Sequence, residues 1–365
     1  MFTLHAIQAE FGDCLLLEYG NAADPRFILV DGGPPRTFPD HLSAVLAQKT
    51  GGALERVILS HVDADHIAGL LELFAELRRQ RGDGEAELVT LGGLWHNSFA
   101  STLDPEGVIA PRLAGLLAVN GMAAAMDHTA ISVLGIGEGN SLRQSALLHQ
   151  VPLNADLPDP ITVDSAQQAV TFDNLTLTVV GPTQANLDAL REKWEEWLDE
   201  HEAAVASGDP VVMANSDTSV PNLSSICVIA EADGRTALLT GDARSDFLYE
   251  GLKAKGLLDQ LGRVHFDLLK VPHHGSDRNI TRWFFEHVTA DRYVISANGK
   301  HGNPDLPTLL WLVDAARAGQ RQVEIIVTNE TDSTRELLQV RPPAASGYTL
   351  TILPTGSDSI AVQLA

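Results

Sequence analysis

Short apolar runs separated by turn-forming residues open the chain. Residues 2–9, 14–19 and 27–31 are such runs, and the segments FGD, NAADP and DGGPP lie between or after them. This pattern predicts three strands of a β-meander. Residues 40–50 have the spacing of a short helix, and the compact run ERVILS predicts another strand that ends at Ser60.

An amphipathic helix is predicted soon after that strand. In IAGLLELFAELRRQR, apolar residues recur at helical spacing from Leu70 to Leu77, and the pattern ends at Gly82. Residues 100–215 are less regular, so we interpret them as an insertion within a single domain that spans residues 1–365.

One clear helical pattern lies inside this insertion, from Asn186 to Ala206. Its Trp194 and Trp197 are three residues apart and share one helical face. We expect them to pack the helix onto the rest of the domain. A lid over the cleft and a contact in a homo-oligomer are the alternatives.

The second half of the chain repeats one arrangement, in which an apolar run delivers polar residues at its end. The runs are SSICVIAEA, TALLTGDA, DLLKVPHHGS, RYVISANGKHG and VEIIVTN. They predict a series of strands. The final segment GYTLTILPTGSDSIAVQL predicts a hairpin that turns at PTGSD.

Charge and composition restrict the possible partners. The 365 residues are 44% hydrophobic and 20% charged, which is typical of a globular protein. With 48 acidic and 25 basic residues, the net charge of −23 opposes sequence-independent attraction to long duplex DNA. A local group of cations could still receive a phosphate.

The same survey gives an expectation about compartment. No segment has 18 uninterrupted apolar residues, so no membrane partner is expected, and the first residues lack the pattern of a secretory leader. Cys14 and Cys227 lie in apolar runs, where a reduced buried thiol is the expected state. We therefore expect a cytoplasmic location.

The densest group of metal-binding residue types is SHVDADH, which places His61, Asp63, Asp65 and His66 within six residues. In an extended loop, alternate residues point the same way, so the first three can face one cavity while His66 begins the helix. Such mixed nitrogen and oxygen ligands suit zinc, manganese or iron. Alternatively, Asp65 caps a helix that begins near Ile67, but capping gives the two imidazoles no role.

Three later motifs also follow apolar runs. They are Gly241-Asp242, His273-His274-Gly275-Ser276 and His301-Gly302. Each alone is compatible with an ordinary turn or helix start. Together they place most of the chemically useful histidines at the ends of strands.

These motifs, in this order, resemble the metallo-β-lactamase superfamily from the first strand to about residue 304. Within it, GDCLLLEY, LVDGG, SHVDADH, LLTGDA, LKVPHHGS and ISANGKHGNP are most similar to the nuclease domain of ComEC-like competence proteins. The resemblance implies an α/β fold, a four-layer αββα sandwich with the metals where the two sheets meet and Asp31 supporting the site from behind.

The resemblance also implies a set of site residues. The metal ions would be surrounded by His61, Asp63, Asp65, His66, Asp242 and either His273 or His274, with His273 taken as the ligand and Asp242 as the bridge. His301 would lie near the substrate or a metal.

The chain departs from the superfamily pattern at two positions. Asp63 stands where a histidine is usual, although ComEC-like members share the aspartate. No histidine precedes the strand that leads to Asp242, where Asn222 or Ser225 stands instead. One metal site is therefore expected to be weak or open. His96 is a possible substitute, but we expect it to be a packed core residue.

These residues lead to a functional hypothesis. Two divalent ions, manganese or zinc, would lower the pKa of a shared water and hold the reacting oxygens. Asp65, Lys270, His274 and His301 are the expected catalytic groups. The expected substrate-orienting residues are Ser276, Asn298 and Asn222.

We therefore expect a phosphodiesterase or nuclease that acts on a nucleic acid or a small nucleotide. The alternatives are a hydrolase of a lactone, thioester or β-lactam, and a non-catalytic binding module. Fold alone does not choose among them.

Overall fold

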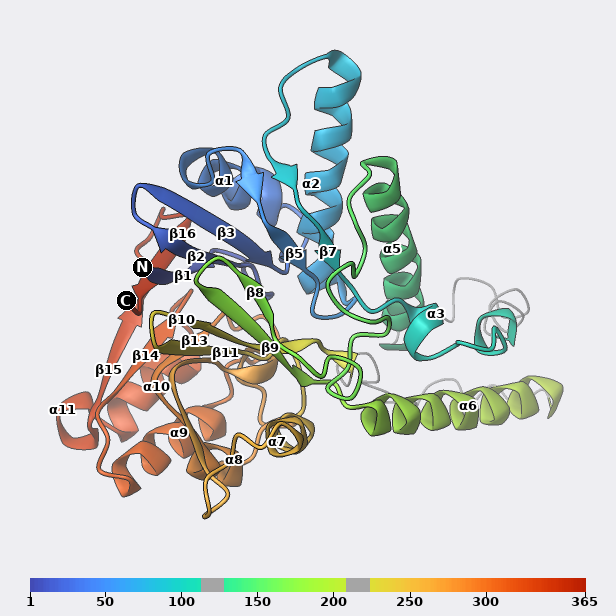
Figure 1. The fold of residues 1–365 in the computed structure, drawn as a ribbon. Coiled ribbons are helices and arrows are strands. Elements are labelled where there is room, and N and C mark those ends of the chain that lie inside the picture. Colours follow the sequence, from blue (N-terminus) through green and yellow to red (C-terminus); the bar gives the residue numbers. More distant parts are fainter. Residues whose placement is uncertain (113–127, 208–223) are drawn as a thin grey trace.

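Two β-sheets stacked face to face, with helices on both outer faces, form the body of the molecule (Figure 1). The computed structural model describes residues 1–112, 128–207 and 224–365. This arrangement confirms the predicted αββα sandwich. No helix in those ranges is both long and apolar enough to cross a bilayer.

The first sheet has six strands in the order β16-β1-β2-β3-β5-β7. Their bounds are β1 (Phe2–Ile7), β2 (Leu15–Asn21), β3 (Asp24–Val30), β5 (Arg56–Ile58), β7 (Leu94–Trp95) and β16 (Ser359–Gln363). The antiparallel meander β1–β3 is confirmed, and β5 and β7 extend it in parallel. A short parallel pair, β4 (Ala53–Leu54) and β6 (Thr90–Leu91), lies outside this sheet.

The second sheet has eight strands in sequence order from β8 to β15. Their bounds are β8 (Val170–Phe172), β9 (Leu175–Gly181), β10 (Cys227–Ala232), β11 (Arg235–Leu239), β12 (Val264–Lys270), β13 (Val288–Ile295), β14 (Val323–Val327) and β15 (Tyr348–Ile352). Strands β8 to β11 are antiparallel and β11 to β15 are parallel. Residues 100–215 thus contribute β8 and β9 to the sandwich itself.

The predicted C-terminal hairpin is wrong. Strand β15 pairs in parallel with β14, whereas β16 pairs with β1 in the other sheet. Leu350 packs toward the helices outside the second sheet, and Val362 packs between the sheets. The turn at PTGSD therefore carries the chain from one sheet to the other, because each sheet has an edge strand that the tail can pair with.

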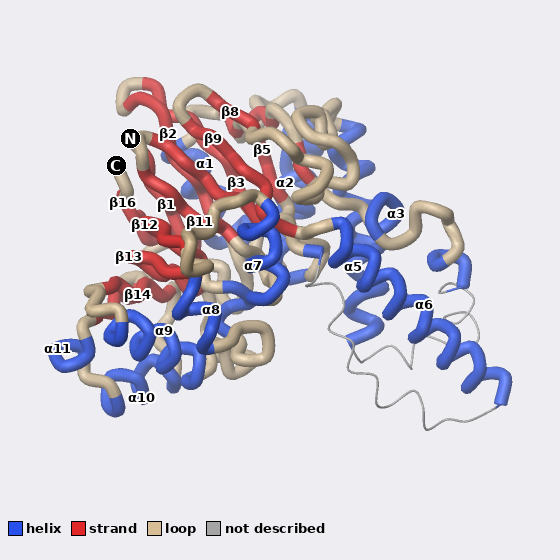
Figure 2. Tube along the Cα trace, turned by 60° about the horizontal axis from the view of Figure 1, so that its bottom comes forward, coloured by secondary structure: helices blue, strands red, loops and turns tan. Residues whose placement is uncertain are grey.

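Helices cover both outer faces (Figures 1 and 2). The first sheet is covered by η1 (Phe38–Leu42), α1 (Ser43–Lys49), α2 (Ala64–Asp83) and α5 (His128–Leu148). The second is covered by α7 (Ser245–Ala254), α8 (Arg282–His287), α9 (Leu306–Ala318), α10 (Asp332–Val340) and α11 (Pro343–Ser346). Helix α3 (Phe99–Thr102) and the long α6 (Gln184–Ser207) lie to one side of the sandwich.

Alternating side chains divide the core into three layers. Leu15 and Leu17 of β2 point between the sheets, whereas Leu16 points toward the helices. Cys14 and Cys227 are free and buried, as expected. The loops after β5, β11, β12 and β13 carry the polar motifs and meet at one edge of the sandwich.

Candidate metal centre

The loop after β5 leads directly into α2, which begins at Ala64 and not near Ile67. Asp63 is therefore the N-cap residue, and Asp65 and His66 lie in the first helical turn. The carbonyl of Asp63 accepts hydrogen bonds from the N–H groups of His66 and Ile67, and no side chain caps the helix. The alternative role of Asp65 as N-cap is wrong, which leaves its carboxylate available for other contacts.

A tight turn after β11 brings Asp242 against this loop. Gly241 has a φ of 49°, and a Cβ atom there would lie 2.8 Å from Cβ of Ser60. Only glycine allows both that backbone and that close approach. As a result the buried Oδ1 of Asp242 lies 3.3 Å from Nε2 of His66.

The turn after β12 supplies two histidines in unusual backbone conformations. His273 and His274 have φ values of 44° and 54°, a region that side chains other than glycine seldom adopt. Nε2 of buried His274 lies 3.4 Å from both Asp65 Oδ2 and Asp242 Oδ2. Nε2 of the more exposed His273 lies 3.6 Å from Asp242 Oδ2. Both rings face Asp242.

Two groups of side chains can be distinguished around Asp242. Subsite A consists of Asp65, His66, Asp242 and His274, whose ligand atoms all lie within 4.8 Å of one another. Subsite B consists of His61, Asp63 and Asp242. There, Nε2 of His61 lies 3.6 Å from Asp63 Oδ2 and 3.9 Å from Asp242 Oδ2.

Hydrogen bonds to Nδ1 set the orientation of the two histidines of subsite A. Nδ1 of His274 lies 2.9 Å from the carbonyl oxygen of Ser296, which can only accept. Nδ1 of His66 lies 2.9 Å from a carboxylate oxygen of Asp31. Both Nδ1 atoms therefore carry the proton when the rings are neutral, and each Nε2 presents a lone pair.

His61 is oriented in the same way through an intermediate hydroxyl. Ser60 Oγ donates to Asp31 at 2.7 Å, so this oxygen can accept from Nδ1 of His61, which lies 3.0 Å away. Ser60 N also donates to Asp31. Asp31 thus supports the site from behind, as the resemblance implied.

Several atoms that converge on this point have no hydrogen-bond partner in the part of the chain that the structure describes. Among the described residues, these buried atoms include Nε2 of His61, His66 and His274 and Oδ1 of Asp242. A buried polar atom without a partner costs on the order of 1–3 kcal/mol. Three lone pairs from imidazoles and one carboxylate oxygen match the donor set of a divalent transition metal.

The electrostatics of the cluster favour positive charge. Burial by itself would lower the pKa of His274, yet the carboxylates of Asp242 and Asp13 raise it well above its ordinary value. Burial would raise the pKa of Asp242, but His274, His66 and His273 hold it well below its usual range. Without a cation the cluster therefore attracts protons, which bound metal ions would displace.

The expected role of Lys270 at the substrate is wrong, because its side chain is completely buried. Nζ forms an ion pair with Asp13, donates to the carbonyl of Gly241 at 3.0 Å and lies 3.8 Å from Asp242 Oδ1. Asp13, Asp31 and His66 also form a compact group. Lys270 already provides that group with its cation, so it acts as a counter-charge behind Asp242.

Asp13 was missed by sequence reasoning, although it belongs to the GDC motif. It is 1% exposed, and its Oδ1 lies 3.5 Å from Nδ1 of His274. An acidic residue directly before a buried strand was the available signal, because such a position is rarely buried without a partner.

Two other predicted residues, Ser276 and Ser225, lie around the centre. Ser276 is buried in the turn after His274, where its N–H donates to the carbonyl of His273. Ser225 Oγ lies 3.4 Å from Nδ1 of His61 and accepts from the N–H of Asp242. It therefore contacts the side of the His61 ring that faces away from subsite B. Asn222 lies outside the described residues.

The loop after β13 places Lys300 and His301 against Phe11. His301 is exposed and packs edge-on against Phe11, with ring centroids 5.5 Å apart, and Lys300 Nζ lies 3.6 Å above the same ring. The neighbouring Gly12 packs so closely on Asp65 that a Cβ atom would lie 1.9 Å from its carbonyl oxygen. Lys300 was not predicted, and its place beside the site depends on this contact between distant loops.

Asn298 is held by neighbours in this loop. Its side-chain amide donates to Glu10, and its carbonyl oxygen accepts from the N–H of Lys300. It therefore shapes the loop that presents Lys300 and His301.

His96 is fully buried beside Gly139, and neither ring nitrogen has a hydrogen-bond partner in the described residues. Burial, with a smaller contribution from Arg143, lowers its pKa to about 4. It does not belong to either compact metal-binding group found among the described residues.

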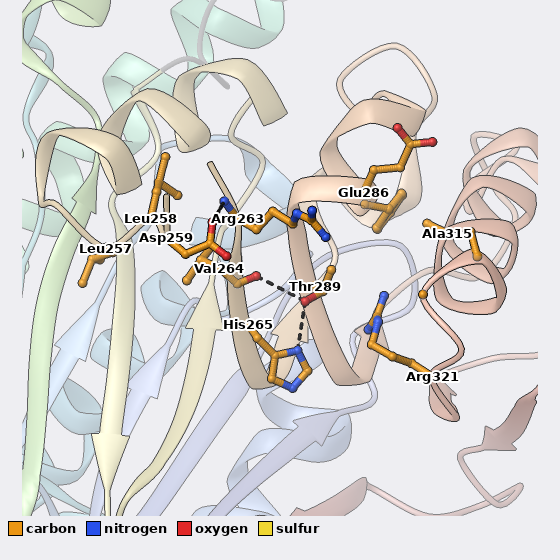
Figure 3. Close-up of a pocket in the computed structure, with 13 residues that line it drawn as sticks. Leu257, Leu258, Asp259, Arg263, Val264, His265, Glu286, Thr289, Ala315 and Arg321 are labelled. Carbon is orange, nitrogen blue, oxygen red and sulfur yellow. Dashed lines mark hydrogen bonds between the residues drawn. The ribbon is translucent and has the colours of Figure 1, made fainter. Parts of the chain in front are cut away.

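A cavity of about 840 Å³ lies elsewhere, between α8, α9 and the first residues of β12 and β13 (Figure 3). Its polar lining includes Arg263, His265 and Arg321, and His265 Nδ1 is 2.9 Å from Thr289 Oγ1. The cavity is at the opposite strand ends from the histidine cluster, so it is separate from the candidate metal centre.

Comparison with known proteins gives a family match for the first part of the chain. Residues 9–111 match the family model described as the metallo-beta-lactamase superfamily. No curated protein matches the chain significantly. One solved structure, described as a new diphosphatase from the PhnP family, is 12% identical, with a TM-score of 0.42, over 100% of this chain and 98% of that chain. A structural similarity with so low an identity and TM-score carries no information about activity. Residues 9–111 are thus similar to the metallo-β-lactamase superfamily, and the two stacked sheets with helices on both outer faces form the metallo-β-lactamase fold.

Proposed function

We propose that this protein is a metal-dependent hydrolase that uses two divalent cations, one in each subsite, to cleave phosphodiester bonds. The observation that carries the proposal is the convergence of the unpartnered Nε2 atoms of His61, His66 and His274 on the carboxylate of Asp242. A non-catalytic binding module has no need for this arrangement.

Each subsite would use its own residues to hold a cation. His66, His274 and Asp65 would hold the cation of subsite A, His61 and Asp63 that of subsite B, and Asp242 would contact both. Divalent cations bound there would supply Lewis acidity and activate a water. Both histidines of the HH motif face Asp242, but only His274 belongs to the compact subsite A, so we assign it, and not His273, as the metal ligand.

An anionic substrate is supported by the edge of the site. Lys300 and His301 contact the ring of Phe11, whose neighbour Gly12 packs on the backbone of Asp65, and from there they could contact a phosphoryl oxygen. His301 could also donate a proton to a leaving alkoxide. The motifs LKVPHHGS and ISANGKHGNP resemble those of ComEC-like nucleases. This resemblance also favours a phosphate-containing substrate. A neutral lactone would not require the positive charge of Lys300.

The decisive variant is Asp242→Asn, which keeps the shape of the side chain and removes its charge. We expect it to lose bound metal and at least about a thousandfold of its activity on bis(p-nitrophenyl) phosphate, because both subsites share this carboxylate. Asp65→Ala should have the same effect through subsite A. Asp246→Asn, an exposed carboxylate on α7 paired with Arg244, is the matched control.

A substrate panel separates the alternatives. Metal content by mass spectrometry and turnover of a phosphodiester, a lactone, a thioester and a β-lactam should be measured together. Faster turnover of a non-phosphate ester would reject the proposed substrate class. Full activity of Asp242→Asn would reject the proposed metal centre.

A further inference from the structure

The cavity at the first residues of β12 and β13 is a second concave site on this molecule. Its lining comes from the loop before β12, from α8 and from the end of α9 with the residues that follow it (Figure 3). A volume of about 840 Å³ is enough for a small-molecule ligand. None of its lining residues belongs to subsite A or subsite B, so its chemistry is independent of the candidate metal centre.

Two arginines give this cavity unneutralised positive charge. Elsewhere in the second half of the chain, arginines commonly pair with a carboxylate, as do Arg235, Arg244, Arg282, Arg292, Arg335 and Arg341. Arg263 and Arg321 form no such ion pair with any described residue, although acidic residues outnumber basic ones in this chain. Arg321 donates to the carbonyl of Ala290 at 2.9 Å, a contact that fixes its guanidinium without neutralising the charge.

The other ionisable groups of the lining are engaged with neighbours. Nε2 of His265 lies 3.2 Å from a carboxylate oxygen of Asp291. The Asp259 carboxylate accepts two backbone N–H groups of its own loop, both at 2.8 Å. Glu286 pairs with Arg282, with Nε and Oε1 3.0 Å apart. The two arginines are therefore the groups of the described lining that are best placed to receive an anion.

The positive charge is concentrated at this place. Figure 3 shows the guanidinium groups of Arg263 and Arg321 directed toward the middle of the cavity. Arg317, at the end of α9, lines an adjoining cavity together with Arg321 and also forms no ion pair with a described residue. A guanidinium presents paired N–H groups that match the oxygens of a phosphate. Two of them match the double charge of a phosphate monoester.

Apolar side chains form much of the remaining lining. They include Leu258, Val264, Phe285 and Ala315. A phosphate group alone would fill only a small part of this volume and would leave the apolar surface in water. A ligand that also carries a flat apolar ring would cover that surface, and burial of the ring would add to the affinity.

We propose that this cavity binds a small organic phosphate monoester that carries an aromatic ring, the chemical class of mononucleotides. Arg263 and Arg321 would contact the phosphate, and the apolar residues of the lining would contact the ring. This inference goes beyond the proposed function and does not depend on it. The cavity would be a second ligand site, at the ends of β12 and β13 opposite the metal centre.

The test is calorimetric titration of the full chain with adenosine 5′-monophosphate and, separately, with inorganic phosphate. Each titration should be made on the protein as purified and again after treatment with chelator, because metal ions at the other site would also attract phosphate. We expect the nucleotide to bind at the cavity with the same affinity before and after chelation. Inorganic phosphate should bind at least about tenfold more weakly, because it leaves the apolar lining uncovered.

Variants of the two arginines assign the binding to this cavity. Arg263→Gln and Arg321→Gln should each weaken nucleotide binding at least about tenfold, because each removes charge-assisted hydrogen bonds to the phosphate. Arg79→Gln, which removes the same charge from an exposed arginine on α2, should bind like wild type. Unfolding curves establish that each variant is folded. Because Arg263 is exposed, its variant remains a valid test even if loss of the Arg321 contact impairs folding.

Three results would contradict the inference. Nucleotide binding that disappears on chelation would assign the ligand to the metal centre alone. Wild-type affinity in both arginine variants would exclude the cavity as the binding site. Equal affinity for the nucleotide and for inorganic phosphate would reject an aromatic ring as part of the ligand. None of these results bears on metal-dependent hydrolysis, which the Asp242→Asn variant tests separately.

Discussion

His96 and His274 are both buried, yet their pKa values move in opposite directions. His274 faces the carboxylates of Asp242 and Asp13, which raise its pKa well above the ordinary value. Among the described residues no acidic side chain pairs with His96, so burial lowers its pKa to about 4. Neighbouring charge, and not burial alone, distinguishes a residue of the metal centre from a histidine of the core.

The depressed pKa of His96 predicts a pH-dependent stability. An unfolded chain binds this proton near pH 6.5, but the folded protein does not until about pH 4. Stability is therefore lost as the pH falls through this window, by up to about 3 kcal/mol. Denaturant unfolding of the apoprotein should show a smaller acid loss for His96→Gln than for wild type. Equal losses would mean that His96 is not buried in the neutral form.

Asp63 leads to a prediction about metal choice. Its carboxylate offers an oxygen ligand, and oxygen ligands favour manganese or magnesium more than nitrogen ligands do. We expect the chelator-stripped enzyme to be most active with manganese, while zinc binds tightly and supports slower turnover. Asp63→His should shift this preference toward zinc. Higher activity of wild type with zinc, and no shift in the variant, would exclude Asp63 as the determinant.

At the scale of elements, α6 packs against the segment after β7. Trp194 is 4% exposed and meets the ring of Phe99 edge-on, with centroids 6.1 Å apart. Leu187, Leu190 and Leu198 are buried on α6. These contacts agree with the expectation that the helix packs onto the domain, while the side chain of Trp197 lies outside the described residues.

Trp194→Ala should therefore reduce stability and leave the metal centre intact. Removing a buried tryptophan costs about 3 kcal/mol through lost burial and the resulting cavity. Glu195→Ala, the exposed neighbour, should change stability by less than about 0.5 kcal/mol. Urea unfolding and manganese titration test both statements. A loss of metal affinity in Trp194→Ala would instead indicate that α6 shapes the site.

At the scale of the whole molecule, the net charge of −23 opposes long polyanionic substrates. The favourable cations near the site are local, while the repulsion is long-ranged and screened by salt. We expect kcat/KM for long single-stranded DNA to rise several-fold from low to physiological salt. Bis(p-nitrophenyl) phosphate, which carries a single negative charge, should show little change. A fall for long DNA would reveal a basic surface that guides it.

The amino-acid sequence by itself indicated the first three strands, the long α2 and the candidate ligands of the SHVDADH loop, because local periodicity and short spacing depend on neighbouring residues. It also placed Asp242 and the paired histidines at strand ends. Tertiary structure decided what those residues meet. Lys270 became a buried partner of Asp13, and β15 and β16 joined different sheets. Each outcome depends on packing between segments far apart in the chain, where a few ångströms settle whether a charge is buried, paired or open to a ligand.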